Sequence, residues 1–157
     1  MEIQCKAFEA LSLYELHAIY RLRSEVFVLE QNCAYQDVDD LDLKALHVFF
    51  IQNHKLIAYA RVLAPGLVYP EPAIGRVVVE KGERNKGIAR KLMAYCMRKS
   101  LSLFPAKDIR ISAQAYLEDF YRSLGFKAEG KTYLEDGIPH LSMRFNHLNN
   151  SATFDPL

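Results

Sequence analysis

The stretch from Ile74 to Ser100 constrains the fold most, because strand, loop and helix patterns follow one another in it without a break. Its first part, Ile74–Val79, is apolar and includes three successive valines, which is typical of a strand buried on both faces. A polar loop follows, and apolar residues then recur at helical spacing from Ile88 to a limit at Pro105. A buried strand that leads directly into a helix indicates an α/β fold.

The end of this loop has the features of an anion-binding site. Gly87 has no Cβ, so the backbone can come close to a ligand. The first turn of a helix leaves backbone N–H groups unpaired, and the helix dipole adds partial positive charge there. Four basic residues surround this point: Arg84, Lys86, Arg90 and Lys91. The sequence therefore predicts a phosphate or pyrophosphate ligand at the entry to the helix.

Three interpretations of this glycine loop compete. The run from Gly82 to Gly87 matches the first half of a P-loop, but Ile88 and Ala89 replace the lysine and hydroxyl residue that contact phosphate and Mg²⁺. This replacement disfavours a nucleoside triphosphatase. A Rossmann loop requires G-x-G-x-x-G directly after the first strand, and no such run occurs. The loop alone leaves open a third interpretation, in which Gly87 merely begins a helix between basic residues.

The composition of the chain argues against several classes of protein. Twenty basic and nineteen acidic residues nearly cancel, which disfavours a nucleic-acid-binding protein that works by bulk charge. Cys5, Cys33 and Cys96 have no C-x-x-C spacing and are expected as free thiols in a reducing compartment, not in a disulfide or zinc site. The first residues lack a signal-peptide layout, and no apolar run is long enough for a bilayer. We therefore expect a cytoplasmic protein without a metal, a nucleic-acid partner or a membrane partner.

The remaining residues add strands and helices around the central unit. A capping box of Ser12 and Glu15 predicts a first helix, and residues 116–124 predict a short helix that ends at Gly125. Further strands are expected over Ile3–Phe8, Ala45–Gln52, Leu56–Leu63, Ile109–Gln114, Phe126–Tyr133 and Ile138–Phe145. The resulting order is β α β β β α β α β β, which predicts a mixed sheet flanked by helices.

Two details of this layout are specific enough to check. Asn53-His54-Lys55 is expected as a three-residue turn between two antiparallel strands. Residues 1–145 are expected as a single domain, and residues 146–157, which are polar and lack a pattern, as a loose C-terminal tail.

An acidic stretch, residues 28–43, has no clear periodicity and is expected as an ordered loop. An EF-hand is disfavoured, because Leu41 stands where an oxygen ligand belongs and no glycine follows it. Two interpretations stay open: a solvated acidic face, or a wall that attracts a cationic amine substrate. Arg23, on the apolar face of the preceding helix, either reaches a carboxylate or pocket rim, or packs its stem and extends its charge to water.

Two motifs resemble signatures of the GCN5-related N-acetyltransferase (GNAT) superfamily. The first is Arg84-x-x-Gly87-x-Ala89 after an apolar strand, which resembles the acetyl-CoA-binding signature. The second is residues 115–126, AYLEDFYRSLGF, which resemble the aromatic–tyrosine signature ending in Leu-Gly-Phe. Residues 22–33, 35–37, 58–61, 74–77, 113–115 and 135–140 further resemble the ElaA-like branch. The resemblance covers about residues 10 to 145.

The resemblance implies a GNAT-like mixed, mostly antiparallel sheet of six to seven strands. Two central parallel strands, here 74–79 and 109–114, would splay apart and hold the pantetheine arm of acetyl-CoA between them. Gln114 departs from the asparagine that many members carry at this position. The cofactor-binding residues implied are Val77, Val78, Val79, Arg84, Asn85, Lys86, Gly87, Ile88, Ala89, Arg90, Gln114 and Tyr121.

The resemblance also implies acetyl transfer from acetyl-CoA to a primary amine. Tyr121 would be the general acid that protonates the leaving thiolate, and the Val79 N–H would stabilise the oxyanion. The general base stays open among Glu80, His47, Glu25, Glu30 and His140. Candidate acceptor-binding residues are Arg23, Glu30, Gln36, Asp37, His47 and His140. The alternative is a non-catalytic acyl-CoA sensor or protein-interaction module, and either would be a monomer or homodimer.

Overall fold

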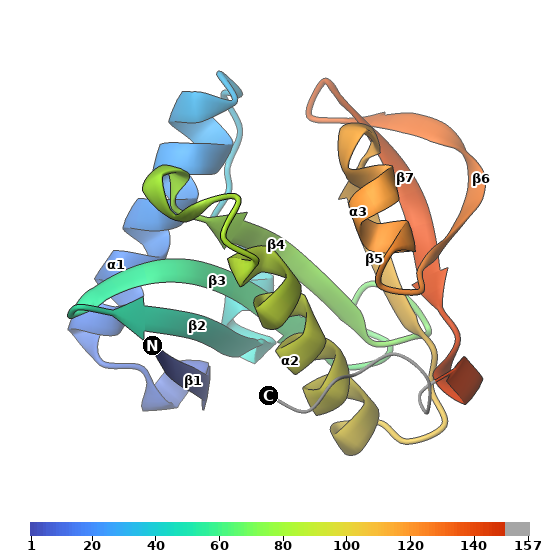
Figure 1. The fold of residues 1–157 in the computed structure, drawn as a ribbon, viewed down its shortest axis with the longest axis horizontal. Coiled ribbons are helices and arrows are strands. Elements are labelled where there is room, and N and C mark those ends of the chain that lie inside the picture. The colour runs from blue at the N-terminus through green and yellow to red at the C-terminus, as the bar shows by residue number, and fades with distance from the viewer. Residues whose placement is uncertain (150–157) are drawn as a thin grey trace.

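The computed structural model describes residues 1–149, and its strands join one seven-stranded sheet (Figure 1). The predicted order of elements and the predicted α/β class are confirmed. The helices and strands are β1 (Glu2–Ala7), α1 (Leu13–Arg23), β2 (Leu46–Gln52), β3 (Lys55–Leu63), β4 (Ala73–Val79), α2 (Ile88–Leu103), β5 (Ile109–Gln114), α3 (Glu118–Arg122), β6 (Lys127–Glu135) and β7 (Ile138–Phe145). The strands lie in the order β1-β2-β3-β4-β5-β7-β6.

The sheet divides into two arms between β4 and β5. All other neighbouring strands are antiparallel, whereas β4 and β5 are parallel and pair only at Ala73 and Arg110. The Arg110 N–H donates to the Pro72 carbonyl at 3.0 Å, and beyond this point the two strands diverge (Figure 1). This arrangement confirms the two central splayed parallel strands.

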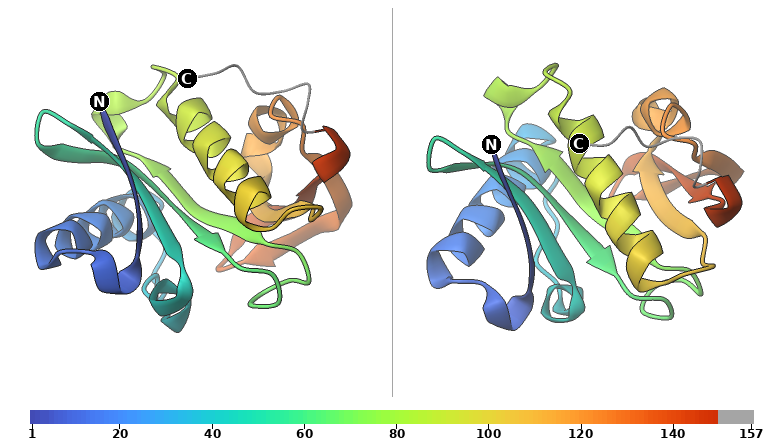
Figure 2. Two further views of the ribbon diagram at one scale, coloured as in Figure 1. Left: turned by 90° about the horizontal axis from the view of Figure 1, so that it is seen from below. Right: turned by 60° about the horizontal axis from the view of Figure 1, so that its bottom comes forward.

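Helices cover both faces of the larger arm, which contains β1 to β4 (Figure 2). On one face, Leu92, Met93 and Met97 of α2 pack against the core side chains of β2 and β3. On the other face, Ile19 and Leu22 of α1 pack with aromatic side chains of the same strands. The amphipathic helices therefore bury a central sheet whose strands are apolar on both sides.

A bulge in β4 turns the strand toward the gap. Its partner register shifts between Tyr59 and Arg61, and Arg76 at the bulge has a φ of 53°. Beyond the bulge, the Glu80 N–H donates to β3 at 2.8 Å. Because backbone groups alternate along a strand, Val77 and Val79 direct their N–H and C=O groups away from β3, into the gap.

Two local predictions were wrong in detail. The β2–β3 turn has two residues, Asn53 and His54, because Lys55 already pairs with Gln52. Both turn residues have positive φ, as a type I′ turn requires, and this turn matches the twist of the flanking strands. After α1 the chain continues as a π-helical segment, Ser24–Glu30, so residues 28–30 of the acidic stretch are helical and not part of a loop.

The acidic stretch and the start of the tail are more ordered than their composition suggests. The rest of the acidic stretch is a loop that ends in a 3-10 helix, Asp40–Lys44. His147–Asn149, at the start of the predicted loose tail, form another 3-10 helix. His147 donates its backbone N–H to Asp108 at 3.0 Å, so this part of the tail is fastened to the domain. The remaining tail, residues 150–157, lies outside the described residues.

Candidate active site

A cleft of about 1250 Å³ opens between the two arms of the sheet. One wall consists of β4 and the start of α2, and the other of β5, α3 and the β6–β7 turn. Its lining includes these residues predicted from the sequence: Glu30, Gln36, Val77, Val78, Val79, Arg84, Asn85, Gly87, Ile88, Ala89, Arg90, Gln114, Tyr121 and His140. Lys86, Arg23, Asp37 and His47 are not among the lining residues.

The start of α2 faces this cleft without a side-chain cap. Gly87 is the N-cap residue, with a φ of 75°, and no side chain hydrogen-bonds to the first turn. Asn85 also has a positive φ, 62°. The sixteen-residue helix therefore presents unpaired N–H groups and the positive end of its dipole at the cleft. Arg90 in its first turn is exposed and donates to Ser123 Oγ at 2.6 Å.

Arg84 links the loop before α2 to the π-helical segment after α1. Its Nε donates to the Val79 carbonyl at 3.1 Å, and its two terminal nitrogens donate to Glu30 at 2.5 and 2.7 Å. This bidentate hydrogen bond holds the pKa of the Glu30 carboxyl below its ordinary value. Lys86 does not line the cleft and pairs with Glu83, which does, at 3.0 Å. The positive charge that was predicted to bind a phosphate is thus partly neutralised at Arg84. At Lys86 it is paired with Glu83.

Tyr121 lies on α3 at the wall of the cleft. Its ring packs edge-on against Phe120 and Phe126, with centroid distances of 5.0 and 6.1 Å. Burial raises the pKa of the Tyr121 hydroxyl, and the neighbouring Tyr116 and Cys96 raise it further. The hydroxyl therefore stays protonated at neutral pH, as a proton donor must.

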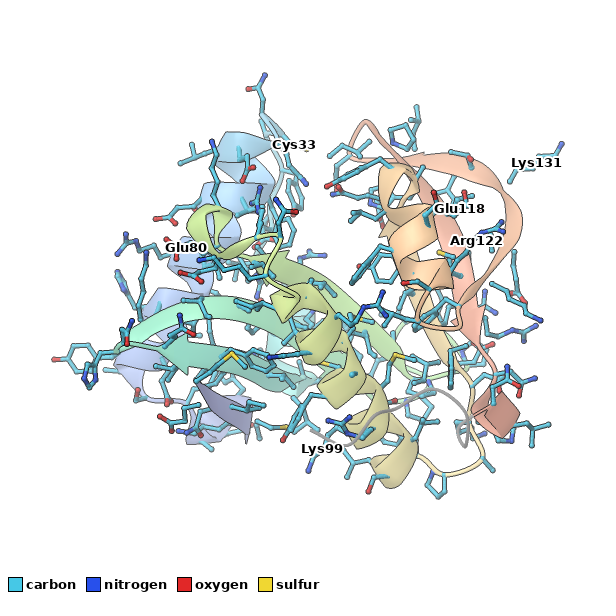
Figure 3. The ribbon with its side chains drawn as sticks, in the orientation of Figure 1. Cys33, Glu80, Lys99, Glu118, Arg122 and Lys131 are labelled. Atoms are coloured by element: carbon cyan, nitrogen blue, oxygen red, sulfur yellow. The ribbon has the colours of Figure 1, made fainter. Side chains whose placement is uncertain are left out.

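Two contacts join the arms at the open end of the cleft. Gln31 and Gln114 exchange reciprocal amide hydrogen bonds, both 3.1 Å long. Cys33, on the arm that carries α1 (Figure 3), donates from Sγ to the Asp136 carbonyl in the β6–β7 turn at 3.2 Å. The side-chain amide of Gln114 is thus engaged with the opposite arm.

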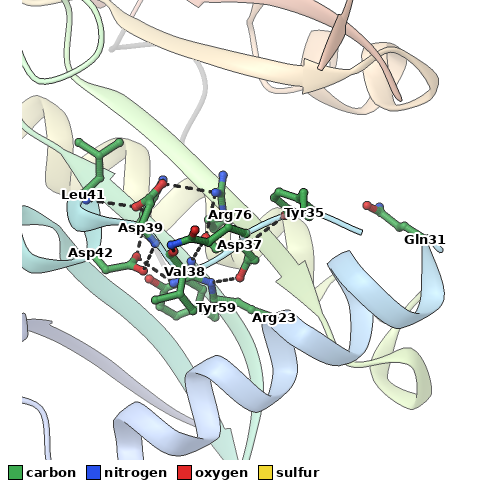
Figure 4. Close-up of polar contacts among 12 residues, drawn as sticks. Arg23, Gln31, Tyr35, Asp37, Val38, Asp39, Leu41, Asp42, Tyr59 and Arg76 are labelled. Carbon is green, nitrogen blue, oxygen red and sulfur yellow. Dashed lines mark hydrogen bonds and ion pairs between the residues drawn. The ribbon is translucent and has the colours of Figure 1, made fainter. Parts of the chain in front are cut away.

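The acidic stretch is neither a solvated face nor an uncompensated acidic wall. It contributes three carboxylates to an ionic network with three arginines (Figure 4): Asp37, Asp39, Asp42, Arg23, Arg61 and Arg76. Arg23 is fully buried and donates to Asp37 and Asp42 at 2.8 Å each. Equal numbers of positive and negative groups make the network neutral, so neither open interpretation describes these three carboxylates, whereas Asp40 is exposed. Arg23 does reach carboxylates, so the expectation that its side chain binds a carboxylate is confirmed.

His47 also belongs to this buried region. Its Nε2 donates to the Asp42 carbonyl at 2.8 Å, so Nδ1 accepts from the Tyr59 hydroxyl, also at 2.8 Å. Burial lowers the pKa of His47. Arg23, Asp37 and His47 are all buried beside the cleft without lining it, so the structure contradicts their expected place against an acceptor.

Two further base candidates lie outside the cleft. Glu25 pairs with Arg21 at 2.8 Å, and Glu80 pairs with Lys55. Of the five candidates, only Glu30 and His140 line the cleft, and Glu30 is engaged by Arg84. Among residues 1–149, no group of three or more His, Cys, Asp or Glu side chains is arranged to hold a metal ion.

Sequence reasoning missed a polar cluster on the second wall. Ser112 on β5 contacts Tyr133 and donates to Glu135 at 3.2 Å, and His140 Nε2 lies 3.2 Å from the same carboxylate. The alternation in IRISAQ contains a signal, since buried Ile111 and Ala113 leave Ser112 on the other face. The partners of Ser112 come from β6 and β7, and the pairing of β5 with β7, which brings them to Ser112, is not visible in the chain order.

Comparison with known proteins identifies the family. The acetyltransferase (GNAT) domain matches residues 15–147. A UPF0039 protein of Synechocystis is 45% identical over 139 residues, which cover 88% of this chain and 90% of that protein. Protein ElaA of Escherichia coli is 40% identical over 135 residues, which cover 85% of this chain and 88% of ElaA. No helix in residues 1–149 is long and apolar enough to cross a membrane.

Two crystal structures share the fold. An acyl-CoA N-acyltransferase from Pseudomonas aeruginosa has a TM-score of 0.87 and 39% identity, covering 92% of this chain and 99% of that one. E. coli ElaA has the same TM-score, 37% identity and the same coverage of both chains. From the matched domain, the related sequences and the shared fold, the chain belongs to the GNAT acetyltransferase family, in its ElaA-like branch.

Proposed function

We propose that this protein is an acetyl-CoA-dependent N-acetyltransferase that moves an acetyl group to a primary amine. The observation that carries the proposal is the gap between β4 and β5, which leads to the uncapped start of α2. The gap leaves the inward backbone groups of Val77 and the Val79 N–H without a neighbouring strand, whereas the Val79 carbonyl accepts from Arg84. An amide-rich arm supplies the partners that the free groups need.

Acetyl-CoA fits this cleft at two places. Its pyrophosphate suits the N–H groups from Asn85 to Ala89, with Arg84 and Arg90 nearby and Lys86 free to turn from Glu83. Its pantetheine arm suits the gap beside Val77–Val79, with Ile88, Gln114 and Tyr121 completing the walls. When bound, the cofactor supplies a thioester whose carbonyl carbon accepts an amine.

Residues of this chain then assist the transfer. The Val79 N–H points into the gap and donates to the carbonyl oxygen as that oxygen gains negative charge. The Tyr121 hydroxyl donates a proton to the departing sulfur, since burial keeps it protonated. The acceptor must arrive as a neutral amine, because an alkylammonium has no lone pair. Both base candidates that line the cleft are engaged, Glu30 by Arg84 and His140 by Glu135, so the proposal assigns no side chain as the base.

The cofactor part of the proposal is tested by binding. At a concentration 100 times its Kd, acetyl-CoA should stabilise the protein by about 2.7 kcal/mol, which corresponds to a melting shift of about 5–10 °C. Amide hydrogen exchange should slow at Asn85 to Ala89. No shift and no protection would remove acetyl-CoA as the ligand.

The enzymatic part is tested by thiol release with a panel of primary amines. Turnover supports the transferase, whereas cofactor binding without turnover on any amine supports the alternative, a non-catalytic acyl-CoA sensor or interaction module. The proposal includes a cytoplasmic location, with which the free thiols of Cys5, Cys33 and Cys96 agree. It also includes a monomer or homodimer, which light scattering distinguishes.

A further inference from the structure

Charge is distributed unevenly among the acidic side chains of the cleft. The carboxylates that line it in the described chain are Glu30, Asp39, Glu83, Glu135 and Asp136. The first three each pair with an arginine or lysine. Glu135 has only His140 as a basic partner, and Asp136 forms no ion pair with any residue of the described chain. Negative charge without a fixed cation therefore gathers at the β6–β7 turn.

The basic side chains of the cleft show the opposite distribution. Those that line it in residues 1–149 are Arg61, Arg76, Arg84 and Arg90. The first three pair with carboxylates, whereas Arg90, at the start of α2, binds the Ser123 hydroxyl and forms no ion pair with a described residue. The cleft is thus polarised, positive at α2 and negative at the β6–β7 turn. Figure 1 shows that these two segments lie on different arms of the sheet. The proposed cofactor phosphates match the positive end, which leaves the negative end for the acceptor.

The Glu135 carboxylate is held in place at this negative end. Ser112 Oγ donates to Oε2 at 3.2 Å, and Ser112 in turn contacts the Tyr133 hydroxyl. His140 Nε2 lies 3.2 Å from the same oxygen, Oε2. The contacts of Glu135 with the described residues thus use one carboxylate oxygen and leave Oε1 for a ligand. The side chain is 51% exposed, so a ligand in the cleft can reach it.

The Nε2 atom of the His140 ring also needs a hydrogen-bond donor. Its Nδ1 lies 2.7 Å from the Ile138 carbonyl, which only accepts, so Nδ1 carries a hydrogen. The ring also stacks on Tyr133, with centroids 6.1 Å apart, and the residue is 8% exposed. In the neutral ring Nε2 is an acceptor that faces another acceptor, the carboxylate. Such a pair is satisfied by an extra proton or by a donor from a ligand, and an ammonium group supplies three N–H donors and a positive charge.

We propose that Glu135 binds a second, non-reacting ammonium group of the acceptor, with Ser112 and His140 as positioning residues. The acceptor class is therefore an amine with a further positive charge, such as a diamine. The reacting amine must attack as a neutral group, whereas a carboxylate without an arginine or lysine partner favours the charged ammonium form, so one nitrogen cannot take both roles. This inference rests on the proposed transferase activity.

Matched amines test the proposal. Butylamine and 1,4-diaminobutane, and pentylamine and 1,5-diaminopentane, differ by one terminal ammonium. With acetyl-CoA and thiol release as the readout, we expect kcat/KM to be at least tenfold higher for each diamine than for its monoamine. In Glu135→Gln the KM of the diamines should rise about tenfold, with kcat and the monoamine KM within twofold. Equal rates for both members of each pair, or an unchanged preference in the variant, would overturn the proposal.

Positioning and control variants sharpen this test. His140→Ala should raise the diamine KM with little change in kcat, and His140→Gln, whose amide can donate to Oε2, should restore part of the loss. Glu118→Gln is the matched control, because Glu118 pairs with Arg122 on α3 (Figure 3) and is not a lining residue. A change in diamine preference in this control as large as that in Glu135→Gln would contradict a specific role for Glu135.

A binding measurement separates this inference from the transferase proposal. Calorimetric titration of 1,4-diaminobutane into the protein saturated with CoA should show binding that weakens about tenfold in Glu135→Gln. If this binding is seen but no amine is acetylated, the transferase proposal fails and the ammonium site stands. If amines are acetylated but the diamine affinity does not depend on Glu135, the ammonium site fails and the transferase stands.

Discussion

The two walls of the cleft offer different kinds of recognition. The wall of β4 and α2 presents backbone groups, from Val77, Val79 and the first turn after Gly87, together with the side chains of Arg84 and Arg90. The wall of β5 and the β6–β7 turn presents side chains, above all Glu135 and His140. A backbone site depends on geometry and survives most side-chain changes, whereas a side-chain site changes with one substitution. We therefore expect stable cofactor binding beside an easily altered choice of acceptor.

The largest expected effect concerns the chemistry between the two walls. Tyr121→Phe removes the proposed proton donor but keeps the buried ring against Phe120 and Phe126. Since general acid catalysis contributes about 10²–10⁴-fold, turnover in steady-state assays should fall at least about 100-fold. Cofactor affinity should stay within about twofold. The control Tyr14→Phe changes an exposed ring on α1 and should have no effect. Unchanged turnover in Tyr121→Phe would remove Tyr121 as the acid.

The next effect concerns the stability that the buried ionic network gives to the arm that carries the β4 wall. Asp42→Asn removes a carboxylate that binds both Arg23 and Arg61 in the buried network. Breaking a buried ion pair costs about 3–5 kcal/mol, because a charge is left without its partner. Urea denaturation should show this loss. Asp40→Asn, on the same 3-10 helix but exposed, should change stability by less than about 0.5 kcal/mol. Similar losses in both variants would contradict a stabilising network.

The sequence predicted the backbone wall better than the side-chain wall, and the reason is physical. A strand, a glycine and a helix start are local features, so the stretch from Ile74 to Ser100 specifies their geometry by itself. The cluster of Ser112, Glu135 and His140 forms only when β5, β7 and β6 pair in register. That register depends on contacts between segments far apart in the chain.

The acidic stretch shows the same limit of prediction from sequence, because its partners also come from distant segments. Its carboxylates were assigned to solvent or to a substrate, because nothing local shows that Arg23, Arg61 and Arg76 converge on them. These arginines come from α1, β3 and the bulge of β4. A count of charges along the sequence therefore misplaced the negative end of the cleft, which the structure puts at Glu135.

A smaller effect tests whether the first wall depends on backbone geometry. Gly87→Val places a β-branched side chain at a φ of 75°, which costs at least about 1–2 kcal/mol of strain. Because this strain opposes the shape of the anion site, the Kd for acetyl-CoA should rise about tenfold in calorimetry. Gly82→Val is the matched control, since no atom lies within 4 Å of a Cβ there and its φ is not positive. An unchanged Kd in Gly87→Val would contradict the backbone site.

The smallest effect tests how much side-chain charge contributes to the affinity of the β4–α2 wall for acetyl-CoA. Glu30→Gln breaks the ion pair with Arg84 and frees the guanidinium for a phosphate. If backbone N–H groups supply most of the affinity, the Kd for acetyl-CoA should fall only about two- to threefold, since exposed ion pairs are worth about 0–1 kcal/mol. Screening should shrink this gain further as salt rises. Glu25→Gln, which breaks the exposed pair with Arg21 outside the cleft, should leave the Kd unchanged. A gain of tenfold or more would mean that Arg84, and not the backbone, is the main phosphate-binding group.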